Sequence, residues 1–523
     1  MSAREGKIAP VITRTLRACG AVLLAAQASP ALGASAGGWS AARTLSTCAG
    51  SAGPGLAFPS ESPSAPTGPG AVTWAQGPGC TGRSRGAQLT LAVSALDKDE
   101  RPAKPVLQRL PGAGATGLQA VGASRGRVAV LATVAGASPG TSLLQGVARA
   151  PLSVVPLPVA AALPSLARAY LGDSAIATVE PGPAIAVRVE RYFQSAFAPA
   201  QRIPIGPGPV SALVATMDYR SDVLLAWQQN GAIYAHMLRA SGRAEPTQLV
   251  GRSAPDPQLR ALVSDNDHGM IAWSGAEGSA PAPRTSVRIA FSGAGTRFAG
   301  NRLITSFADP RGVARGAGSL GLVRLSTENV MLAWTDAEAG SYVVRAAPAV
   351  FAGTRPAQRL SDPGAQSVLA DLAAGPAGEA VALWRSAAAA APLGLPRSEL
   401  WAARAVIERH GRIGSRAAEL VAPAAANADP SLAVDPASDR AVATWLTLGA
   451  RPSVEYAVGP GASGYRPRPA LAKASQGAGG SHSERIAIGA AAVAVAAVTI
   501  LLLRRGARSR NAGGAASRMR RRR

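Results

Sequence analysis

Six apolar runs that end in tryptophan decide the fold of this chain. They are GAVTW (70–74), VLLAW (223–227), GMIAW (269–273), VMLAW (330–334), AVALW (380–384) and AVATW (441–445). Two weaker copies lack the tryptophan, RVAVL ending at Leu131 and SAIAT ending at Thr178. Together they make eight units with a mean spacing of 53 residues. A fixed period of this length indicates a repeat architecture.

Each unit divides into short strands, and the last unit shows how. SLAVD (431–435) is an apolar run, PASD (436–439) a turn, RAVATW (440–445) a buried strand and SVEYAV (453–458) a further strand. A fourth strand falls at a second apolar marker, which recurs at Ile203, Leu249, Leu303, Leu360 and Leu420. Four strands in each unit are typical of a propeller blade. The sequence therefore predicts an all-β protein, a β-propeller of seven or eight four-stranded blades over residues 41–472.

The repeat resembles the broad class of secreted bacterial β-propellers, from about Thr44 to Ala472. No particular family is indicated, because neither the Ser-x-Asp-x-Gly-x-Thr-Trp box of sialidase-like propellers nor regular Trp-Asp endings occur. We expect the repeated tryptophans to fill the wedges between blades, each burying roughly 200 Å². Trp401 departs from the repeat and is the candidate for an aromatic platform that binds sugars.

The first 36 residues have the order of a secretory signal peptide. Basic residues come first, the apolar run ACGAVLLAAQA (18–28) follows, and small residues end the segment. Cleavage after Gly33 or Ala36 suits the signal peptidase, and we assign 1–36 to the signal. Cys19 precedes most of the apolar run, so we do not expect it to carry a lipid.

A second apolar segment, Ile486–Leu503, has 18 residues and no charge. As a helix it spans about 27 Å, which covers the hydrocarbon core of a bilayer. A buried helix of a soluble protein is the alternative. Four arginines follow at once: Arg504, Arg505, Arg508 and Arg510. Because arginine beside an apolar span stays on the cytoplasmic side, we predict one transmembrane helix with the C-terminus in the cytoplasm.

The segments beside this helix complete the predicted topology. Residues 473–485 are a flexible tether rich in Gly and Ser, and 504–523 form an Arg-rich cytoplasmic tail that contacts anionic lipid headgroups. The protein is thus expected in the cell membrane as a single-pass protein with its bulk outside the cytoplasm. Gly-Gly before an apolar helix also resembles bacterial sorting tails that are removed after export, and the sequence leaves open whether the helix is retained.

Two cysteines remain in the exported chain, Cys48 and Cys80. Export into an oxidising compartment allows them to form one disulfide. Its loop of roughly thirty residues would contribute about 3 kcal/mol in the chain-entropy model. Two free thiols are the alternative.

The sequence offers few residues for catalysis. None of the four histidines, His236, His268, His410 and His482, lies in a metal-binding or catalytic motif. DNDHG (265–269) spaces Asp265 and Asp267 as cation ligands are spaced, yet the same residues are ordinary turn formers. Nucleophile-elbow and Walker motifs are absent. We therefore assign no catalytic, cofactor-binding or metal-binding residue, and expect no cofactor.

Paired carboxylates are the remaining catalytic possibility, because glycoside hydrolysis uses two acids that converge in space. The acids considered are Asp218, Asp222, Asp336, Glu338, Asp435 and Asp439. Most fall at predicted turns, where acids are usually solvated. Carboxylates clustered at one mouth of the channel, one with a raised pKa, would favour an enzyme. A smooth or loop-filled channel would favour a binding module.

The net charge is +24, of which nine arginines lie in the last twenty residues. The rest still leaves a basic body, which favours polyanionic partners, although biased codon composition explains the same excess of arginine. Export excludes nucleic acid as the expected partner. We predict a membrane-anchored, extracytoplasmic binding or scaffold module for a wall polymer, glycan or protein. The alternative is an extracytoplasmic carbohydrate-active enzyme with its site in the channel.

Overall fold

The computed structural model describes residues 38–461. Its gaps are 51, 60–68, 78–87, 112–113, 124–125, 136–139, 158–161, 170–171, 192–196, 265–266, 278–282, 294–296, 327–328, 351–352, 355, 363, 389–396 and 409–410. All described residues belong to the first of the two units into which the chain divides, Met1–Tyr465. The predicted signal, tether, apolar helix and tail (1–36, 473–485, 486–503 and 504–523) lie outside the described residues.

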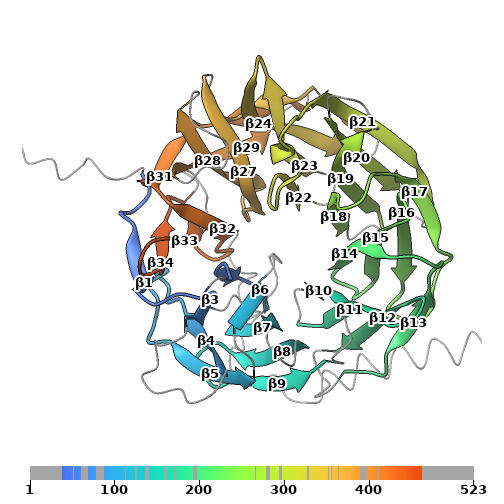
Figure 1. The fold of residues 1–523 in the computed structure, drawn as a ribbon, viewed down its shortest axis with the longest axis horizontal. Coiled ribbons are helices and arrows are strands. Elements are labelled where there is room, and N and C mark those ends of the chain that lie inside the picture. The colour runs from blue at the N-terminus through green and yellow to red at the C-terminus, as the bar shows by residue number, and fades with distance from the viewer. Residues whose placement is uncertain are drawn as a thin grey trace, which may run out of the picture. The chain divides into compact units, whose positions relative to one another are not determined.

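Eight antiparallel sheets make up the described part of the chain, and they form a ring of blades (Figure 1). The innermost strands are β2 (Gly55–Ala57), β6 (Gly114–Ala123), β10 (Ala162–Arg168), β14 (Val210–Met217), β18 (Gln258–Val263), β22 (Leu320–Arg324), β27 (Ala365–Ala374) and β32 (Asn427–Val434). Each contacts the innermost strand of the next blade, and β32 contacts β2. The eight-bladed propeller is therefore confirmed.

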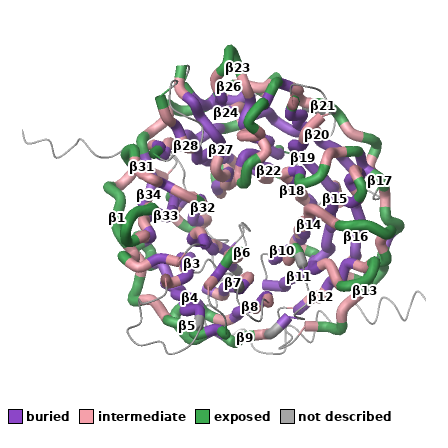
Figure 2. The backbone as a smooth tube through the Cα atoms, viewed as in Figure 1, coloured by how far each residue is buried: buried purple, intermediate pink, exposed green. Residues whose placement is uncertain are grey.

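The second strand of every blade carries one of the repeated markers. These strands are β3 (Ala71–Gln76), β7 (Arg127–Ala135), β11 (Ser174–Glu180), β15 (Val223–Gln229), β19 (Gly269–Glu277), β23 (Val330–Glu338), β28 (Glu379–Ala388) and β33 (Ala441–Thr447). All seven residues of β15 are buried, for example. Both faces of a blade pack against neighbouring blades, which is why these strands are apolar throughout instead of alternating. Figure 2 shows the burial of these strands.

Third and outer strands complete the blades. The third strands are β4 (Gln88–Ala95), β8 (Gly140–Val147), β12 (Ala184–Glu190), β16 (Ala232–Leu238), β20 (Arg284–Ser292), β24 (Ser341–Val350), β29 (Ser398–Ile407) and β34 (Ser453–Val458). The outer strands are β5 (Val106–Pro111), β9 (Ser153–Pro156), β13 (Gln201–Pro204), β17 (Gln248–Arg252), β21 (Phe298–Ala308), the pair β25 (Gly353–Thr354) and β26 (Gln358–Arg359), the pair β30 (Ile413–Ser415) and β31 (Glu419–Ala425), and β1 (Arg43–Ser46). The one helical element named among the described residues is a 3₁₀ turn, η2 (Val313–Arg315).

The last blade joins the two ends of the propeller. Strand β1 pairs with β34, so that Arg43 lies opposite Tyr456 and Thr44 opposite Glu455. The N-terminal strand thus supplies the outer edge of a sheet whose other three strands come from the C-terminal end. This pairing closes the ring. Without residues 43–46 the eighth blade would lack its outer strand.

Tryptophans pack between blades, as the sequence predicts. Trp227 lies in one cluster with Ile185 and Val187 of the third blade, and Trp74 lies with Val442 and Leu446 of the last blade. Both indoles are about 1% exposed. Each is therefore a wedge against the preceding blade.

The second unit corrects one detail of the repeat. Leu131 faces the third blade, where it packs with Leu166 and Ile176, whereas Val130 and Ala132 face the first blade. The end of the apolar run is thus one residue out of phase with the tryptophans. Because side chains alternate along a strand, a shift of one residue reverses the face.

Candidate functional site

A groove of about 580 Å³ lies at the outer edge of the ring between the fourth and fifth blades. It is lined by residues of β17 and the segment that follows it, of β19, β20 and β21, and of the β15–β16 turn: Gly231, Leu249, Val250, Gly251, Arg252, Ser253, Ala254, Ala276, Glu277, Ser286, Arg288 and Asn301. Its volume is in the range of small-ligand sites. This is the candidate binding groove.

Three polar side chains in the groove hold one another in place. Arg288 donates from Nη2 to Oε1 of Glu277 at 3.1 Å and from Nη1 to Oδ1 of Asn301 at 3.0 Å. Asn301 in turn donates to the carbonyl oxygen of Val250 at 3.1 Å. Burial favours a higher pKa for Glu277, but hydrogen bonds from Ser306, Arg288 and a further serine outweigh it and lower the pKa. The carboxylate is thus kept ionised as an acceptor.

The remaining lining of the groove supplies apolar surface and uncommitted polar groups. Leu249 is 58% exposed, which is unusual for leucine. The buried hydroxyl of Ser253 has no hydrogen-bond partner among the described residues. A Cβ added at Gly251 would lie 2.6 Å from Trp273 Cζ2, so glycine is required for the backbone to pass over the tryptophan. The groove therefore combines an apolar side with donors and acceptors.

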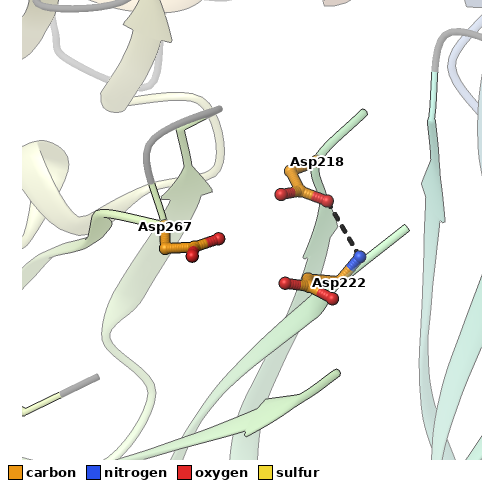
Figure 3. A group of neighbouring side chains, drawn as sticks. All are labelled: Asp218, Asp222 and Asp267. Atoms are coloured by element: carbon orange, nitrogen blue, oxygen red, sulfur yellow. Dashed lines mark hydrogen bonds between the residues drawn. The ribbon is translucent and has the colours of Figure 1, made fainter. Parts of the chain in front are cut away.

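An acidic cluster lies at the opposite end of β15 from the groove (Figure 3). Asp218 and Asp222 belong to the β14–β15 turn, and Asp267 belongs to the β18–β19 turn of the next blade. One carboxylate oxygen of each lies within 4.8 Å of the others. The two turns are more than 40 residues apart in the sequence and belong to different blades. The packing of two neighbouring blades brings the three aspartates together.

Local backbone geometry aims these side chains. Oδ1 of Asp218 accepts hydrogen bonds from the amides of Arg220 at 2.9 Å and Asp222 at 2.8 Å, a common contact of aspartate in turns. Ser221 and Asp267 occupy equivalent places in successive turns and both have positive φ, 69° and 60°. Each amide donates to the carbonyl that opens its turn, from Ser221 to Asp218 and from Asp267 to Ser264, at 3.1 Å.

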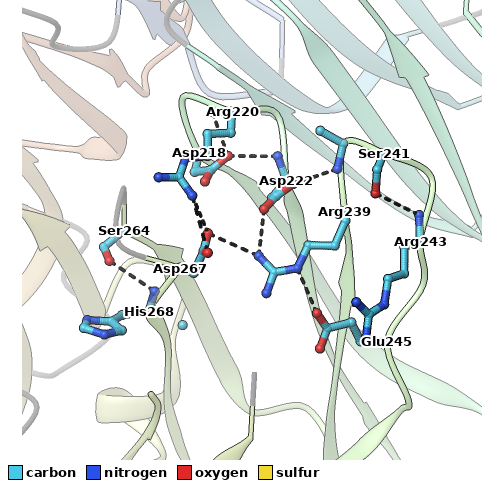
Figure 4. Close-up of polar contacts among 12 residues, drawn as sticks. Asp218, Arg220, Asp222, Arg239, Ser241, Arg243, Glu245, Ser264, Asp267 and His268 are labelled. Carbon is cyan, nitrogen blue, oxygen red and sulfur yellow. Dashed lines mark hydrogen bonds and ion pairs between the residues drawn. The ribbon is translucent and has the colours of Figure 1, made fainter. Parts of the chain in front are cut away.

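Two arginines share the acidic cluster (Figure 4). Arg239 lies 2.7 Å from Asp222, 3.2 Å from Asp267 and 2.8 Å from Glu245. Arg220 lies 3.4 Å from Asp267 and donates to the hydroxyl of Tyr219 at 2.6 Å. Arg239 is thus held from three sides, whereas Arg220 makes one long ion pair at the surface.

Asp218 is the acid in this cluster without an ion pair among the described contacts. Its residue is 3% exposed, and Oδ2 is buried with no hydrogen-bond partner among the described residues. Burial raises the pKa of Asp218 to about 6, and the negative charge of Asp222 adds to the rise. The carboxyl is enclosed, so a saccharide has no direct access to it.

The other acids considered from the sequence do not join this cluster. Asp336 accepts a hydrogen bond from Nε1 of Trp334 at 3.3 Å, and Glu338 pairs with Arg345 at 2.8 Å. Asp435 accepts backbone amides in the β32–β33 turn. Asp439 lies in that turn and contacts Arg404 at 3.4 Å. These acids stabilise the end of β23 and the β32–β33 turn, two places away from the cluster.

The histidines make no catalytic arrangement in the described part of the chain. His236 is buried in β16, Nδ1 lies 3.2 Å from the hydroxyl of Thr247, and burial lowers its pKa. His268 follows Asp267 in its turn. Asp265, His410 and His482 lie outside the described residues, so the predicted pairing of Asp265 with Asp267 is not described.

Trp401 lies in β29 directly opposite Trp384 in β28. It is half-buried against the cluster between the sixth and seventh blades, and its Nε1 donates to Glu399 at 2.7 Å. One side of this indole thus packs against the core, and the sugar platform stays a prediction.

The predicted disulfide and membrane helix are only partly described. Cys48 is disulfide-bonded, whereas Cys80 lies outside the described residues, and the pairing of the two stays a prediction. No helix in the described part of the chain is long and apolar enough to cross a membrane.

No protein-family model and no curated protein matches this chain. Among solved structures, a polysaccharide lyase described as an ulvan lyase of a new family shares 9% identity, with a TM-score of 0.41 over 73% of this chain and 97% of its own. The polysaccharide lyase Uly1 also shares 9%, with 0.40 over 81% and 99%. The six-bladed, fucose-recognising lectin of Aleuria aurantia shares 12%, with 0.34 over 57% and 94%. Likenesses this weak carry no argument about ligand or activity.

Proposed function

We propose that the protein is a membrane-anchored, extracytoplasmic binding module whose propeller takes a glycan in the groove between the fourth and fifth blades. The observation that carries this proposal is the fixed set of Arg288, Glu277 and Asn301 beside exposed Leu249. Sugar hydroxyls need both donors and acceptors, and their C–H faces need apolar contact. A groove that is organised before binding loses little side-chain entropy when the ligand enters.

The anchored topology is supported by the two ends of the sequence. Residues 1–36 have the order of an export signal, and Ile486–Leu503 is followed by arginines. A propeller on a flexible tether presents its grooves away from the bilayer. The test is protease treatment of intact cells, which should digest the propeller and leave a short membrane-bound fragment. A full-length chain that survives protease or leaves the membrane in alkaline carbonate contradicts the topology.

Glycan binding is tested on an array with the full chain purified in detergent. Asn301→Ala removes the amide that orients Arg288, and Arg252→Ala removes a guanidinium at the rim of the groove. We expect either change to weaken binding at least about tenfold, which corresponds to 1.4 kcal/mol. Arg202→Ala is the matched control, because Arg202 pairs with Glu180 at 2.7 Å on the outer strand of the third blade, away from the groove.

One observation, the cluster of aspartates, partly supports the alternative of a carbohydrate-active enzyme. Three aspartates meet beside the innermost strands, and one has a raised pKa. The free oxygen of Asp218 is however enclosed, and Asp222 and Asp267 are paired with Arg239. An acid that donates a proton to a glycosidic bond must reach its oxygen. We therefore prefer binding to catalysis, and release of reducing sugar by the purified chain would reverse that preference.

A further inference from the structure

The turns between the fourth and fifth blades hold more negative charge than their arginines balance. The ion pairs of the cluster join Asp222, Asp267 and Glu245 to Arg239 and Arg220, and Asp218 lies beside them without one. Four carboxylates thus meet two guanidinium groups. The cluster therefore carries a surplus of negative charge, which favours a bound cation.

Oδ2 of Asp218 is the ligand atom that indicates the position of that cation. Oδ1 accepts two backbone amides, and Oδ2 is buried with no partner among the described residues. Figure 3 shows the carboxylate of Asp218 turned toward Asp267, with that of Asp222 facing the same space. A buried carboxylate oxygen without a donor is costly, and a bound cation removes that cost.

The separation of the aspartates suits calcium. Their three ligand oxygens lie within 4.8 Å of one another, close enough for all three to contact one Ca²⁺ at about 2.4 Å. Mg²⁺ requires about 2.1 Å and strict octahedral geometry, which two separate turns supply less readily. Oxygen ligands alone, without nitrogen or sulfur, also favour a hard cation.

A second inter-blade set in the chain lacks the extra acid. Between the seventh and eighth blades, Glu379 and Asp439 occupy the places of Asp222 and Asp267, and Arg404 from within β29 pairs with both. The residue that opens the turn there is Gly375, where the fourth blade has Asp218. A Cβ at Gly375 would lie 2.8 Å from Oδ1 of Asp439, so that turn has no room for a third acidic side chain.

We propose that Asp218, Asp222 and Asp267 bind one Ca²⁺ that fastens the fourth blade to the fifth. Ca²⁺ displaces Arg220 from Asp267, because the Arg220 guanidinium is 49% exposed and its ion pair is long, at 3.4 Å. Arg239 stays, since Asp222 and Glu245 hold it at 2.7 and 2.8 Å. Water completes the coordination shell. The site is separate from the glycan groove, so either proposal stands without the other.

The experiment uses the full chain in detergent, stripped with EDTA. Tb³⁺ is the probe, since Tyr219 lies next to the cluster and can sensitise its luminescence, and Ca²⁺ is the competitor. We expect one Tb³⁺ per chain, displaced by Ca²⁺ with a dissociation constant on the order of 10⁻⁴ to 10⁻³ M, as in extracellular modules. Asp218→Asn should weaken binding at least tenfold. Absence of a signal that Ca²⁺ displaces overturns the proposal.

Two further variants test whether a change in Ca²⁺ affinity is specific to the Asp218, Asp222 and Asp267 site or follows from any loss of a turn aspartate. Asp97→Asn is the matched control, because Oδ1 of Asp97 accepts the amides two and four residues on, as Asp218 does, but Asp97 is exposed. Its Ca²⁺ affinity should equal that of the unchanged chain. Arg220→Ala removes the competing charge and should tighten Ca²⁺ binding about two- to five-fold. If Asp218→Asn does not fold, Arg220→Ala decides, and an unchanged affinity there overturns the proposal.

Discussion

Two inter-blade clusters in this propeller pair an arginine with acids at two equivalent turn positions, to different effect. Between the seventh and eighth blades, Arg404 is 7% exposed and joins Glu379, Asp439 and the carbonyl oxygen of Pro460. Between the fourth and fifth blades, Arg239 joins Asp222, Asp267 and Glu245, and Asp218 adds a carboxyl with no donor for Oδ2. In the first cluster one arginine pairs with both acids, whereas the second cluster contains an acid, Asp218, that makes no ion pair among the described contacts.

A third, simpler set joins the third and fourth blades. Asp173 pairs with Arg191 at 3.0 Å and accepts a hydrogen bond from the hydroxyl of Ser221. A serine in place of the turn aspartate leaves one acid for one arginine. The comparison shows that one acid, one arginine and one turn residue are enough to join two neighbouring blades at this position.

The largest expected effect follows from removing the ion pairs of Arg404 between the seventh and eighth blades. Arg404→Ala leaves Glu379 and Asp439 buried without their cation, which should lower the free energy of unfolding by about 3–5 kcal/mol. Urea denaturation followed by tryptophan fluorescence measures the change. Arg202→Ala, at an exposed pair, should cause little change, and an equal loss in both variants would contradict the assigned role of burial.

A smaller effect of opposite sign, a gain in the free energy of unfolding, is expected when Asp218 is replaced in the cluster between the fourth and fifth blades. The pKa of Asp218 is about 6 in the folded protein against an ordinary 3.8, so ionising it destabilises the fold as pH rises through 6. Without Ca²⁺, Asp218→Asn should therefore stabilise the protein at pH 7.5 by about 1–3 kcal/mol. The gain should vanish near pH 4, where both forms are neutral.

Thermal melting at the two pH values, in EDTA, measures this gain. Calcium should then reverse the ranking at pH 7.5, because it stabilises the unchanged chain and not the variant. A variant that is less stable than the parent in EDTA at pH 7.5 would show that the carboxylate of Asp218 is already compensated.

The smallest effect concerns Arg220. Its ion pair with Asp267 is long and exposed, so water and salt screen it. Arg220→Ala should leave the melting temperature in EDTA unchanged within error at physiological salt. A clear loss of stability would mean that Arg220 is an integral counter-ion of the cluster and not a replaceable one.

The propeller could be predicted because its signal is local. A strand covered on both faces needs an unbroken apolar run, and the wedge against the preceding blade needs a large side chain, so "VLLAW" and its copies report both. The phase of the second unit was missed, since a run that ends in leucine does not show which residue faces which blade. Eight blades instead of seven followed only from the structure, in which each of the eight units, the degenerate ones included, forms a sheet of its own.

The candidate sites could not be predicted in the same way. Asp267 was noticed as a cation ligand, but its partners Asp218 and Asp222 lie in another blade, and Asp218 and Asp222 were considered only as catalytic acids. No sequence motif joins Arg288, Glu277 and Asn301, which come from three strands. Alternation along the strands and the two glycines Gly251 and Gly375 were the available signals, and both became interpretable only with the neighbouring blade in place.

The sequence by itself determined the all-β repeat, the tryptophan wedges and the expectation of export and anchoring, because apolar patterning acts over a few neighbouring residues. Tertiary structure alone decided the number of blades, the groove between the fourth and fifth blades and the surplus carboxyl of Asp218. Each of these depends on which side chains meet across a blade boundary, and electrostatic balance is set by that distance and not by position along the chain.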